Sequence, residues 1–319
     1  MLQEKRRNGG AAMNISITGN LGSGKSSICR ILREKGYEVV SAGTIFRDLA
    51  MEQNLSVEDF NRKVNEDIKK GDHSVDDLID RRTARLDASR SNIVFDSRLA
   101  WHFAPRSFKV FLIVDLDEAA RRVYHDSLRS DSESYASVEV CRKALIHRQE
   151  LEKQRFRELY GVDYFSMENY NLVIESTFAS PGQLAEQILA RFVQYQSGTG
   201  AFANGLTGVV DLNPSSIFPT LEWTQLEWTP IRQAQAGPEL VIGQAGKTWF
   251  ALQGHSALLS AWKTGKVFLP VRVDPLARPA VLTKEAYQEY ERQTGRTFRK
   301  YPDESTGKET NLLQFGKGS

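Results

Sequence analysis

A glycine-rich segment near the start of the chain carries residue types that bind phosphate. Residues 19–26, GNLGSGKS, fit the spacing G-x-x-x-x-G-K-[ST]. Glycines let the backbone curl so that successive N–H groups face a phosphate, and the start of a helix adds partial positive charge. In this pattern the lysine reaches the β- and γ-phosphates, and the serine hydroxyl holds Mg²⁺. The expected nucleotide contacts are Gly19, Gly22, Ser23, Gly24, Lys25, Ser26 and Ser27, with Lys25 also catalytic and Ser26 the metal ligand.

Four arginines recur where phosphoryl transfer needs positive charge. Arg47 and Arg98 each follow a predicted strand, and Arg148 and Arg155 lie seven residues apart on one predicted helix, hence on one face. Together they would hold a donor γ-phosphate and an acceptor phosphate in line. The alternative for each is a solvated or ion-paired surface residue, and for Arg148 the candidate partner is Glu152 at i,i+4.

Asp96 ends the third predicted strand, and we include it among the catalytic candidates. A carboxylate at this end of a parallel strand faces the ligand crevice of such sheets. Two interpretations stand: Asp96 organises Mg²⁺ or the acceptor, or it caps a neighbouring loop. An acceptor that is already a phosphate is anionic, so no proton acceptor is required.

The elements that must position these residues alternate along residues 13–196. Short apolar runs at 15–18, 38–40, 93–95, 110–114 and 172–174 lack polar alternation, as expected for strands buried on both faces of a parallel sheet. Helical patterns lie between them, among them 26–34, 57–70, 137–160 and 181–195. This alternation predicts an α/β domain with a doubly wound parallel sheet.

Four segments in this order resemble a known family. They are GNLGSGKSS from residue 19, SAGTIFRDLA from 41, VFDSRLAW from 94 and HRQELEKQRFRELYGVDY from 147. Residues 13–196 resemble the cytidylate kinase-like group of nucleoside monophosphate kinases, particularly its shorter archaeal-type branch. The resemblance implies a P-loop fold with a five-stranded parallel sheet, and a reaction of ATP with CMP or dCMP that needs Mg²⁺.

The resemblance also implies roles for the acceptor side. Gly43 and Arg47 would border the monophosphate, and Arg98 would contact its phosphate. Arg148 and Arg155 would clamp the transferring group, and a mobile lid from 122 to about 142 would carry Arg129. This lid is rich in serine and acid, and position 42 is alanine where longer relatives carry serine. The acceptor therefore stays open between CMP or dCMP and another small molecule, and a nucleotide-switched regulatory protein is the non-enzyme alternative.

The composition changes after a glycine-rich linker at 197–208. Four of the five tryptophans fall after residue 220, and residues 209–280 predict a small α+β domain, followed by one helix from Lys284 and a loose tail to 319. Residues 209–275 resemble the ParB/sulfiredoxin-like domain, on Gly254, His255 and FLPV at 268–271, although the acidic, second histidine and arginine positions of its motif are replaced. His255 either helps to hold an anion at a helix start or is a buried structural histidine.

The composition fits a cytoplasmic protein of two domains. The chain has 319 residues and a formal net charge of +2, with no apolar run long enough for a membrane helix and only two cysteines. We therefore expect nucleotide substrates and no membrane or clear nucleic-acid partner; a ligand or protein partner of the C-terminal domain stays open. Residues 1–12 are expected to be a disordered leader, with Met13 as the alternative start.

Overall fold

The computed structural model describes residues 13–70, 72, 74–126, 135–205, 208–220, 240–277, 279, 281–298 and 300–302. The N-terminal elements are β1 (Ile15–Gly19), α1 (Lys25–Glu34), β2 (Glu38–Ser41), α2 (Ala42–Glu52), α3 (Val57–Lys69), α4 (Ser74–Ser89), β3 (Ile93–Asp96), α5 (Ala100–Phe103), β4 (Phe108–Ile113), α6 (Leu116–Tyr124), α7 (Val138–Tyr160), the 3₁₀ turn η2 (Met167–Asn169), β5 (Leu172–Glu175) and α8 (Pro181–Ser197). The C-terminal elements are η3 (Gly200–Gly205), β6 (Val209–Leu212), η4 (Pro214–Ser216), β7 (Ile217–Phe218), β8 (Val241–Ala245), β9 (Thr248–Gln253), α9 (His255–Lys263), β10 (Leu269–Val273) and α10 (Lys284–Thr294).

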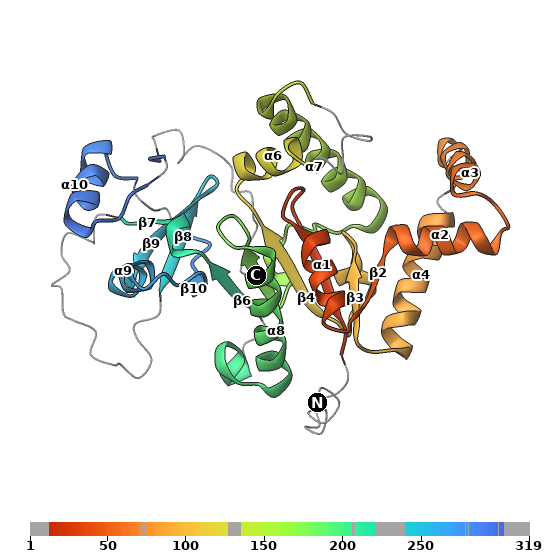
Figure 1. Ribbon diagram of the computed structural model, residues 1–319, viewed down its shortest axis with the longest axis horizontal. Helices are drawn as coiled ribbons and strands as arrows, with labels where there is room; N and C mark the ends of the chain where they lie inside the picture. The colour runs from red at the N-terminus through yellow and green to blue at the C-terminus, as the bar shows by residue number, and fades with distance from the viewer. Residues whose placement is uncertain are drawn as a thin grey trace.

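One sheet runs through the molecule in the order β2-β3-β1-β4-β5-β6-β10-β8-β9-β7 (Figure 1). The first five strands are parallel, which confirms the predicted α/β fold. All five predicted N-terminal strands are present, and the four helical patterns correspond to α1, α3, α7 and α8.

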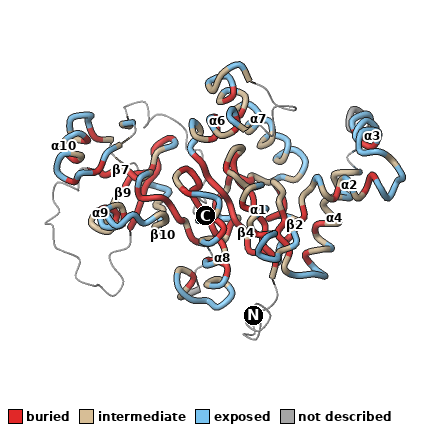
Figure 2. Tube along the Cα trace, in the orientation of Figure 1, coloured by how far each residue is buried: buried red, intermediate tan, exposed pale blue. Residues whose placement is uncertain are grey.

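The parallel strands β1, β3, β4 and β5 are largely buried on both faces, as Figure 2 shows for the central sheet, whereas the edge strand β2 is partly exposed. In β4, Val110 and Leu112 join the core under α1 and α8, whereas Phe111 and Ile113 join the core on the opposite face. Consecutive residues of a strand point to opposite faces, so one apolar run supplies both cores. Packing on both faces of the sheet fixes the carboxyl ends of the strands, where the site lies.

The C-terminal region continues the N-terminal sheet. Strand β6 pairs in parallel with β5, and β10 then pairs antiparallel with β6. Arg191 of α8 and Asp211 of β6 form a buried two-pronged ion pair, with Nη2–Oδ1 at 2.7 Å and Nε–Oδ2 at 2.8 Å. Within the glycine-rich stretch, Phe202 is buried against Phe108 and Tyr195. The two regions of the sequence on either side of the expected linker therefore share a sheet and a core.

Around residue 254 the chain forms β9, then the Gly254-His255 pair, then α9, which begins at His255, and then β10. Trp249 is buried in the same cluster as Phe111 and Leu212, so this tryptophan fills a core that both regions share. Trp223 and Trp228 lie outside the described residues, as does most of the expected tail.

His255 is a buried structural histidine. It is only 6% exposed, and its Nε2 accepts a hydrogen bond from the backbone N–H of Thr220 at 3.3 Å. A nitrogen that accepts a hydrogen bond carries no proton. Burial lowers the pKa of His255 to about 4. Of the two interpretations of this residue, the geometry fits the structural one.

His255 is expected to make the folded state acid-sensitive. The unfolded histidine takes up a proton below its ordinary pKa of about 6.5, whereas the folded one resists protonation until about pH 4. Stability is therefore complete above pH 6.5 and falls as the pH is lowered toward 4, by up to about 3 kcal/mol. Urea unfolding at pH 7.5, 5.5 and 4 measures this fall. The fall in stability should be smaller in His255→Gln and unchanged in the control His147→Gln, which alters an exposed histidine. An equal fall in both variants would contradict the assignment to His255.

No helix in the described ranges is long and apolar enough to cross a membrane.

Candidate active site

The phosphate loop is a tight turn between β1 and α1. Gly22 and Gly24 have φ values of 76° and 86°, in the left-handed region that favours glycine. A Cβ on Gly19 would lie 2.5 Å from the carbonyl oxygen of Leu112, and one on Gly22 would lie 2.9 Å from that of Ala119. The loop is thus pressed against the end of β4 and against α6, and no side chain fits at these two positions.

A second feature of the loop, a buried hydroxyl group, also suits a bound phosphate. The hydroxyl oxygen of Ser23 is buried and has no hydrogen-bond partner among the described residues. Buried polar atoms in folded proteins are normally hydrogen-bonded, so an unpaired hydroxyl inside a glycine cradle suits a ligand oxygen. Ser26 is exposed at the start of α1, where its hydroxyl is accessible to a metal ion. Within the described ranges, no group of three or more His, Cys, Asp or Glu side chains could hold a metal ion.

Lys25 begins α1 in a crowded electrostatic environment. The pKa of its ammonium group is lowered to about 8, chiefly by burial and also by the positive charge of Arg98, whereas Asp96 and Glu152 oppose the shift. These effects place Lys25 close to three residues from other segments of the chain. An anionic ligand at the loop would stabilise the charged form of this lysine.

Arg98 connects the phosphate loop to helix α7. Its Nη1 donates to the carbonyl oxygen of Gly19 at 2.8 Å, and its Nε donates to Oε2 of Glu152 at 2.9 Å. Arg148 Nε donates to the other carboxylate oxygen of Glu152 at 3.3 Å. The structure therefore gathers Lys25, Arg98 and Arg148 at the loop, with Glu152 between the two arginines. The sequence-based alternative that pairs Arg148 with Glu152 is confirmed as a contact.

Asp96 and the start of α2 lie at the same edge of the sheet. Asp96 is in register with Ile17 of β1 and Ser41 of β2. Its carboxylate accepts no hydrogen bond from the residues that the structure describes, and it raises the pKa of Lys25. This arrangement leaves the carboxylate available to a ligand and gives no support to the loop-cap interpretation.

The first turn of α2 presents small and polar groups around Arg47. The Ser41 hydroxyl caps the helix by accepting from the backbone N–H of Thr44 at 3.0 Å. The exposed Arg47 donates from Nη2 to the Thr44 hydroxyl at 3.3 Å, and a Cβ on Gly43 would lie 3.7 Å from Arg47 Nη1. Gly43 and Arg47 are thus neighbours on α2.

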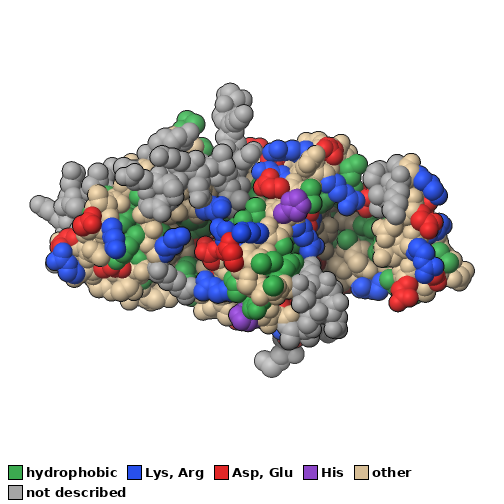
Figure 3. All heavy atoms as spheres, turned by 90° about the horizontal axis from the view of Figure 1, so that it is seen from above, with side chains coloured by type: hydrophobic (Ala, Val, Ile, Leu, Met, Phe, Trp, Pro, Cys, Tyr) green, Lys and Arg blue, Asp and Glu red, His purple; other side chains and the backbone are tan. Residues whose placement is uncertain are grey.

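Arg155 is not brought to the phosphate loop. Its Nη2 donates to Asp76 of α4 at 2.7 Å, and nearby the Tyr160 hydroxyl donates to Asp80 at 2.9 Å. These contacts join α7 to the lobe formed by α2, α3 and α4. Seen from above, the surface is hollowed between this lobe and the centre of the molecule (Figure 3). Seven residues on a helix share a face but lie about 10 Å apart, so Arg148 and Arg155 meet different neighbours.

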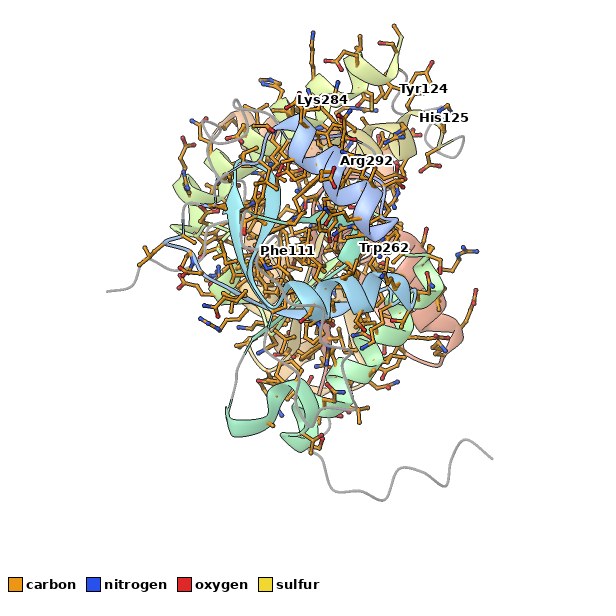
Figure 4. The ribbon with its side chains drawn as sticks, turned by 90° about the vertical axis from the view of Figure 1, so that its left-hand side faces the viewer. Phe111, Tyr124, His125, Trp262, Lys284 and Arg292 are labelled. Carbon is orange, nitrogen blue, oxygen red and sulfur yellow. The ribbon has the colours of Figure 1, made fainter. Side chains whose placement is uncertain are left out.

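The helices on either side of the expected lid are well anchored. Arg122 donates to the carbonyl oxygen of Ser176 at 2.8 Å, and Arg142 donates to Asp117 at 2.8 Å. Tyr124 and His125, at the end of α6, lie at the periphery of the molecule, whereas Phe111 lies in its interior (Figure 4). Arg129, the expected substrate contact on the lid, lies outside the described residues.

Sequence reasoning missed three contributors to the site. Glu152 was considered only as a partner of Arg148, because the i,i+4 spacing is a local signal, whereas its contact with Arg98 spans 54 residues. Gln149 accepts a hydrogen bond from Asn20 Nδ2 of the phosphate loop at 3.1 Å. Thr44 supports Arg47. The contacts of Glu152 with Arg98 and of Gln149 with Asn20 join segments that only folding brings together. Thr44 and Arg47 lie three residues apart on α2, and this helical spacing is the local signal that could have indicated the pair.

Comparison with known proteins finds matches for the N-terminal half. A model of the cytidylate kinase-like family matches residues 14–177. A cytidylate kinase of Methanothermobacter thermautotrophicus is 36% identical over 165 residues, covering 51% of this chain and 95% of the relative. One of Sulfolobus acidocaldarius is 33% identical over 180 residues, covering 56% and 92%. An S-adenosylmethionine-dependent nucleotide dehydratase of Lacinutrix mariniflava is 30% identical over 180 residues, covering 56% of this chain but 35% of the relative.

Proposed function

The chain belongs to the cytidylate kinase-like family and is a nucleoside monophosphate kinase, and from this premise we propose that it transfers the γ-phosphate of ATP to CMP or dCMP. The relatives named as cytidylate kinases support this choice of acceptor. The C-terminal half lies outside these matches, so the proposal concerns the part of the chain from β1 to α8.

The observation that carries the proposal is the position of Arg98. Its guanidinium is fixed to the first residue of the phosphate loop, through Gly19, and to α7, through Glu152. A guanidinium beside a nucleotide cradle is suited to a second phosphate, because it offers paired N–H donors to phosphate oxygens. In a kinase with an uncharged acceptor, the remaining N–H donors of Arg98 would have no acceptor phosphate to bind.

The residues then divide the work as follows. The phosphate loop holds the triphosphate, and Arg47 and Arg98 hold the acceptor monophosphate. An acceptor phosphate oxygen forms a bond to the γ-phosphorus while the bond from that phosphorus to the β–γ bridging oxygen breaks, which releases ADP. Lys25 and Arg148 stabilise the charge on the transferring group. Arg129 would add to the acceptor side, and Arg155 would reach the transferring group only by leaving Asp76.

The residues at the loop also fit Mg²⁺. Ser26 would bind the ion together with phosphate oxygens of the nucleotide, and Asp96 would orient its water ligands. When bound, Mg²⁺ neutralises charge on the β- and γ-phosphates.

The test is ADP release by the purified full-length protein with ATP and Mg²⁺ against a panel of nucleoside monophosphates. We expect the highest kcat/KM with CMP or dCMP. Turnover with a different small acceptor would redirect the substrate assignment. Tight ATP binding without turnover on any acceptor would favour the nucleotide-switched regulatory protein instead.

Arg47 provides a prediction about the acceptor side. Arg47→Ala is expected to raise KM for the acceptor by about tenfold or more, because a lost charge-assisted hydrogen bond typically has an effect of this size. KM for ATP should stay within about twofold. Arg62→Ala, which removes an exposed arginine of α3, is the control. Steady-state kinetics with each substrate varied in turn measure both constants, and an unchanged acceptor KM would remove Arg47 from the site.

For the C-terminal region we propose an accessory domain over residues 209–280, related to the ParB/sulfiredoxin-like domain. The order of β9, Gly254, α9 and β10 supports this relationship. The buried, hydrogen-bonded state of His255 supports a structural role for this histidine rather than catalysis.

A further inference from the structure

Glu152 is the carboxylate that joins the two arginines at the phosphate loop. Its Oε2 accepts from Arg98 Nε at 2.9 Å, and its Oε1 accepts from Arg148 Nε at 3.3 Å. Arg98 is held at a second point by its contact with the carbonyl oxygen of Gly19. The Tyr164 hydroxyl also donates to Oε2 of Glu152, at 3.5 Å. Four segments of the chain, namely the end of β1, the loop after β3, α7 and the loop after α7, therefore meet around one carboxylate.

The contacts on Glu152 leave a defined part of Arg98 available. A guanidinium has five N–H donors in a rigid plane. Glu152 takes the Nε donor, Gly19 takes one donor of Nη1, and Nη2 of Arg98 has no hydrogen-bond partner in the described part of the chain. Two fixed points determine the orientation of the plane, so the remaining donors are presented in one direction. Such a fixed plane of N–H donors is suited to binding a phosphate.

The environment strengthens the effect of this carboxylate. The side chains of Arg98 and Glu152 are only 18% and 20% exposed, so their attraction is less screened by water than that of a surface pair. Lys25 and Arg148 add two positive charges nearby. Without Glu152, these like charges would repel one another, and Arg98 would keep only its contact with Gly19.

A role confined to helix stability does not explain these contacts. An i,i+4 ion pair such as Arg148–Glu152 stabilises an exposed helix by only about 0.3–0.5 kcal/mol. The contact with Arg98 crosses from α7 to the loop after β3, and Arg98 in turn contacts Gly19. Glu152 thus acts on the residues that face the nucleotide.

We propose that Glu152 is a positioning residue that holds Arg98 and Arg148 in the orientation needed to bind the acceptor phosphate and the transferring phosphoryl group. This inference rests on the proposed kinase function. Glu152 itself touches neither substrate, and it acts through the two arginines.

The test compares Glu152→Gln with the matched control Glu150→Gln in the full-length protein. Glu150 lies two residues earlier on α7 and is exposed. Glutamine keeps the size of Glu152 but has only one acceptor oxygen and no charge. For Glu152→Gln we expect acceptor KM to rise and kcat to fall, each by about tenfold or more. KM for ATP should change by less than about twofold, and the thermal unfolding temperature should stay close to that of the wild type.

Two further variants separate positioning from a structural role. Glu152→Asp keeps the charge on a shorter side chain and should recover part of the loss. In an Arg98→Ala background, Glu152→Gln should lower kcat/KM for the acceptor by a smaller factor than in the wild type, because one of the residues through which it acts is absent. If Glu152→Gln lowers kcat/KM by the same factor in the Arg98→Ala background as in the wild type, the proposal is overturned.

The outcomes distinguish this inference from the proposed function. If the wild type turns over no monophosphate, the kinase proposal fails and the role of Glu152 fails with it. If the wild type is active and Glu152→Gln behaves like Glu150→Gln, only the positioning role fails. A variant that is faster than the wild type would show that the carboxylate competes with phosphate for the arginines, which also overturns the proposal. If Glu152→Gln unfolds at a much lower temperature than the wild type, Glu152→Asp provides the test instead. Recovery of the acceptor KM in Glu152→Asp supports the positioning role, and no recovery overturns it.

Discussion

Replacing Lys25 by alanine is expected to lower kcat by about 10²–10³-fold or more, which is the effect of removing one preorganised donor to developing charge. Lys25 begins α1 at the phosphate loop, and both Arg98 and Glu152 influence its charge. Arginines at the loop cannot replace it, because Gly19 and Glu152 hold Arg98 in place and Arg148 extends from α7. ADP release at saturating acceptor measures the loss.

The fold should not suffer from this change. Burial lowers the pKa of Lys25, which means that the folded protein bears a cost for keeping this charge partly out of water. The unfolding temperature of Lys25→Ala is therefore expected to equal or exceed that of the wild type. Lys35→Ala, at the exposed end of the same helix, should retain full activity. Retained turnover in Lys25→Ala would exclude the loop as the catalytic nucleotide site.

The second large effect concerns the buried ion pair that joins α8 to β6, and with it the two regions of the sequence. Asp211→Ala is expected to lower the free energy of unfolding by about 3–5 kcal/mol, since it leaves the buried guanidinium of Arg191 without its counter-charge. The side chain of Asp211 is fully buried and that of Arg191 is 9% exposed, so water cannot replace the lost contacts. Gln187, which donates to Asp211 at 2.7 Å, would lose its acceptor as well. Urea unfolding followed by circular dichroism measures the change.

Two variants show whether the loss arises from the unpaired charge. Arg191→Met combined with Asp211→Leu should be much more stable than Asp211→Ala, because well-packed apolar residues can replace a buried ion pair with little loss. Glu289→Gln removes one member of an exposed pair with Arg292 and should change the free energy of unfolding by less than about 1 kcal/mol. If Asp211→Ala were no more harmful than Glu289→Gln, the buried pair would not be what stabilises the junction of α8 and β6.

This junction also bears on how the C-terminal region relates to catalysis. The buried carboxylate of Glu175, at the end of β5, accepts hydrogen bonds from the Asn213 backbone N–H at 2.9 Å and from the Ser216 hydroxyl. The next residues of that loop, Ser176 and Thr177, receive hydrogen bonds from Arg122 of α6. The cytidylate kinase-like family model matches residues 14–177, and the relatives named as cytidylate kinases align with 51% and 56% of the chain. The C-terminal region lies outside the part that the family model matches, and it packs directly onto the segments beside the phosphate loop.

Local patterns in the sequence determine a large part of this protein. The alternation of apolar runs and helical periods predicts β1–β5 and their main helices, because burial on both faces requires continuous apolar strands. The phosphate loop is also local, since its glycines, Lys25 and Ser26 are consecutive and are placed by one strand and one helix. The pair of Arg148 with Glu152 follows from helical spacing alone.

Tertiary structure decides which distant residues meet. Arg98 and Glu152 are 54 residues apart, and Arg155 and Asp76 are 79 apart, so no periodicity in the sequence predicts either contact. Strand β6 continues the first sheet through backbone hydrogen bonds to the edge strand β5. The backbone groups that form such bonds are nearly the same in every sequence, so the sequence does not indicate whether β6 joins this sheet or starts another. The sequence therefore determines the nucleotide loop, whereas the arrangement of the arginines around it and the union of the two regions arise only when the chain folds.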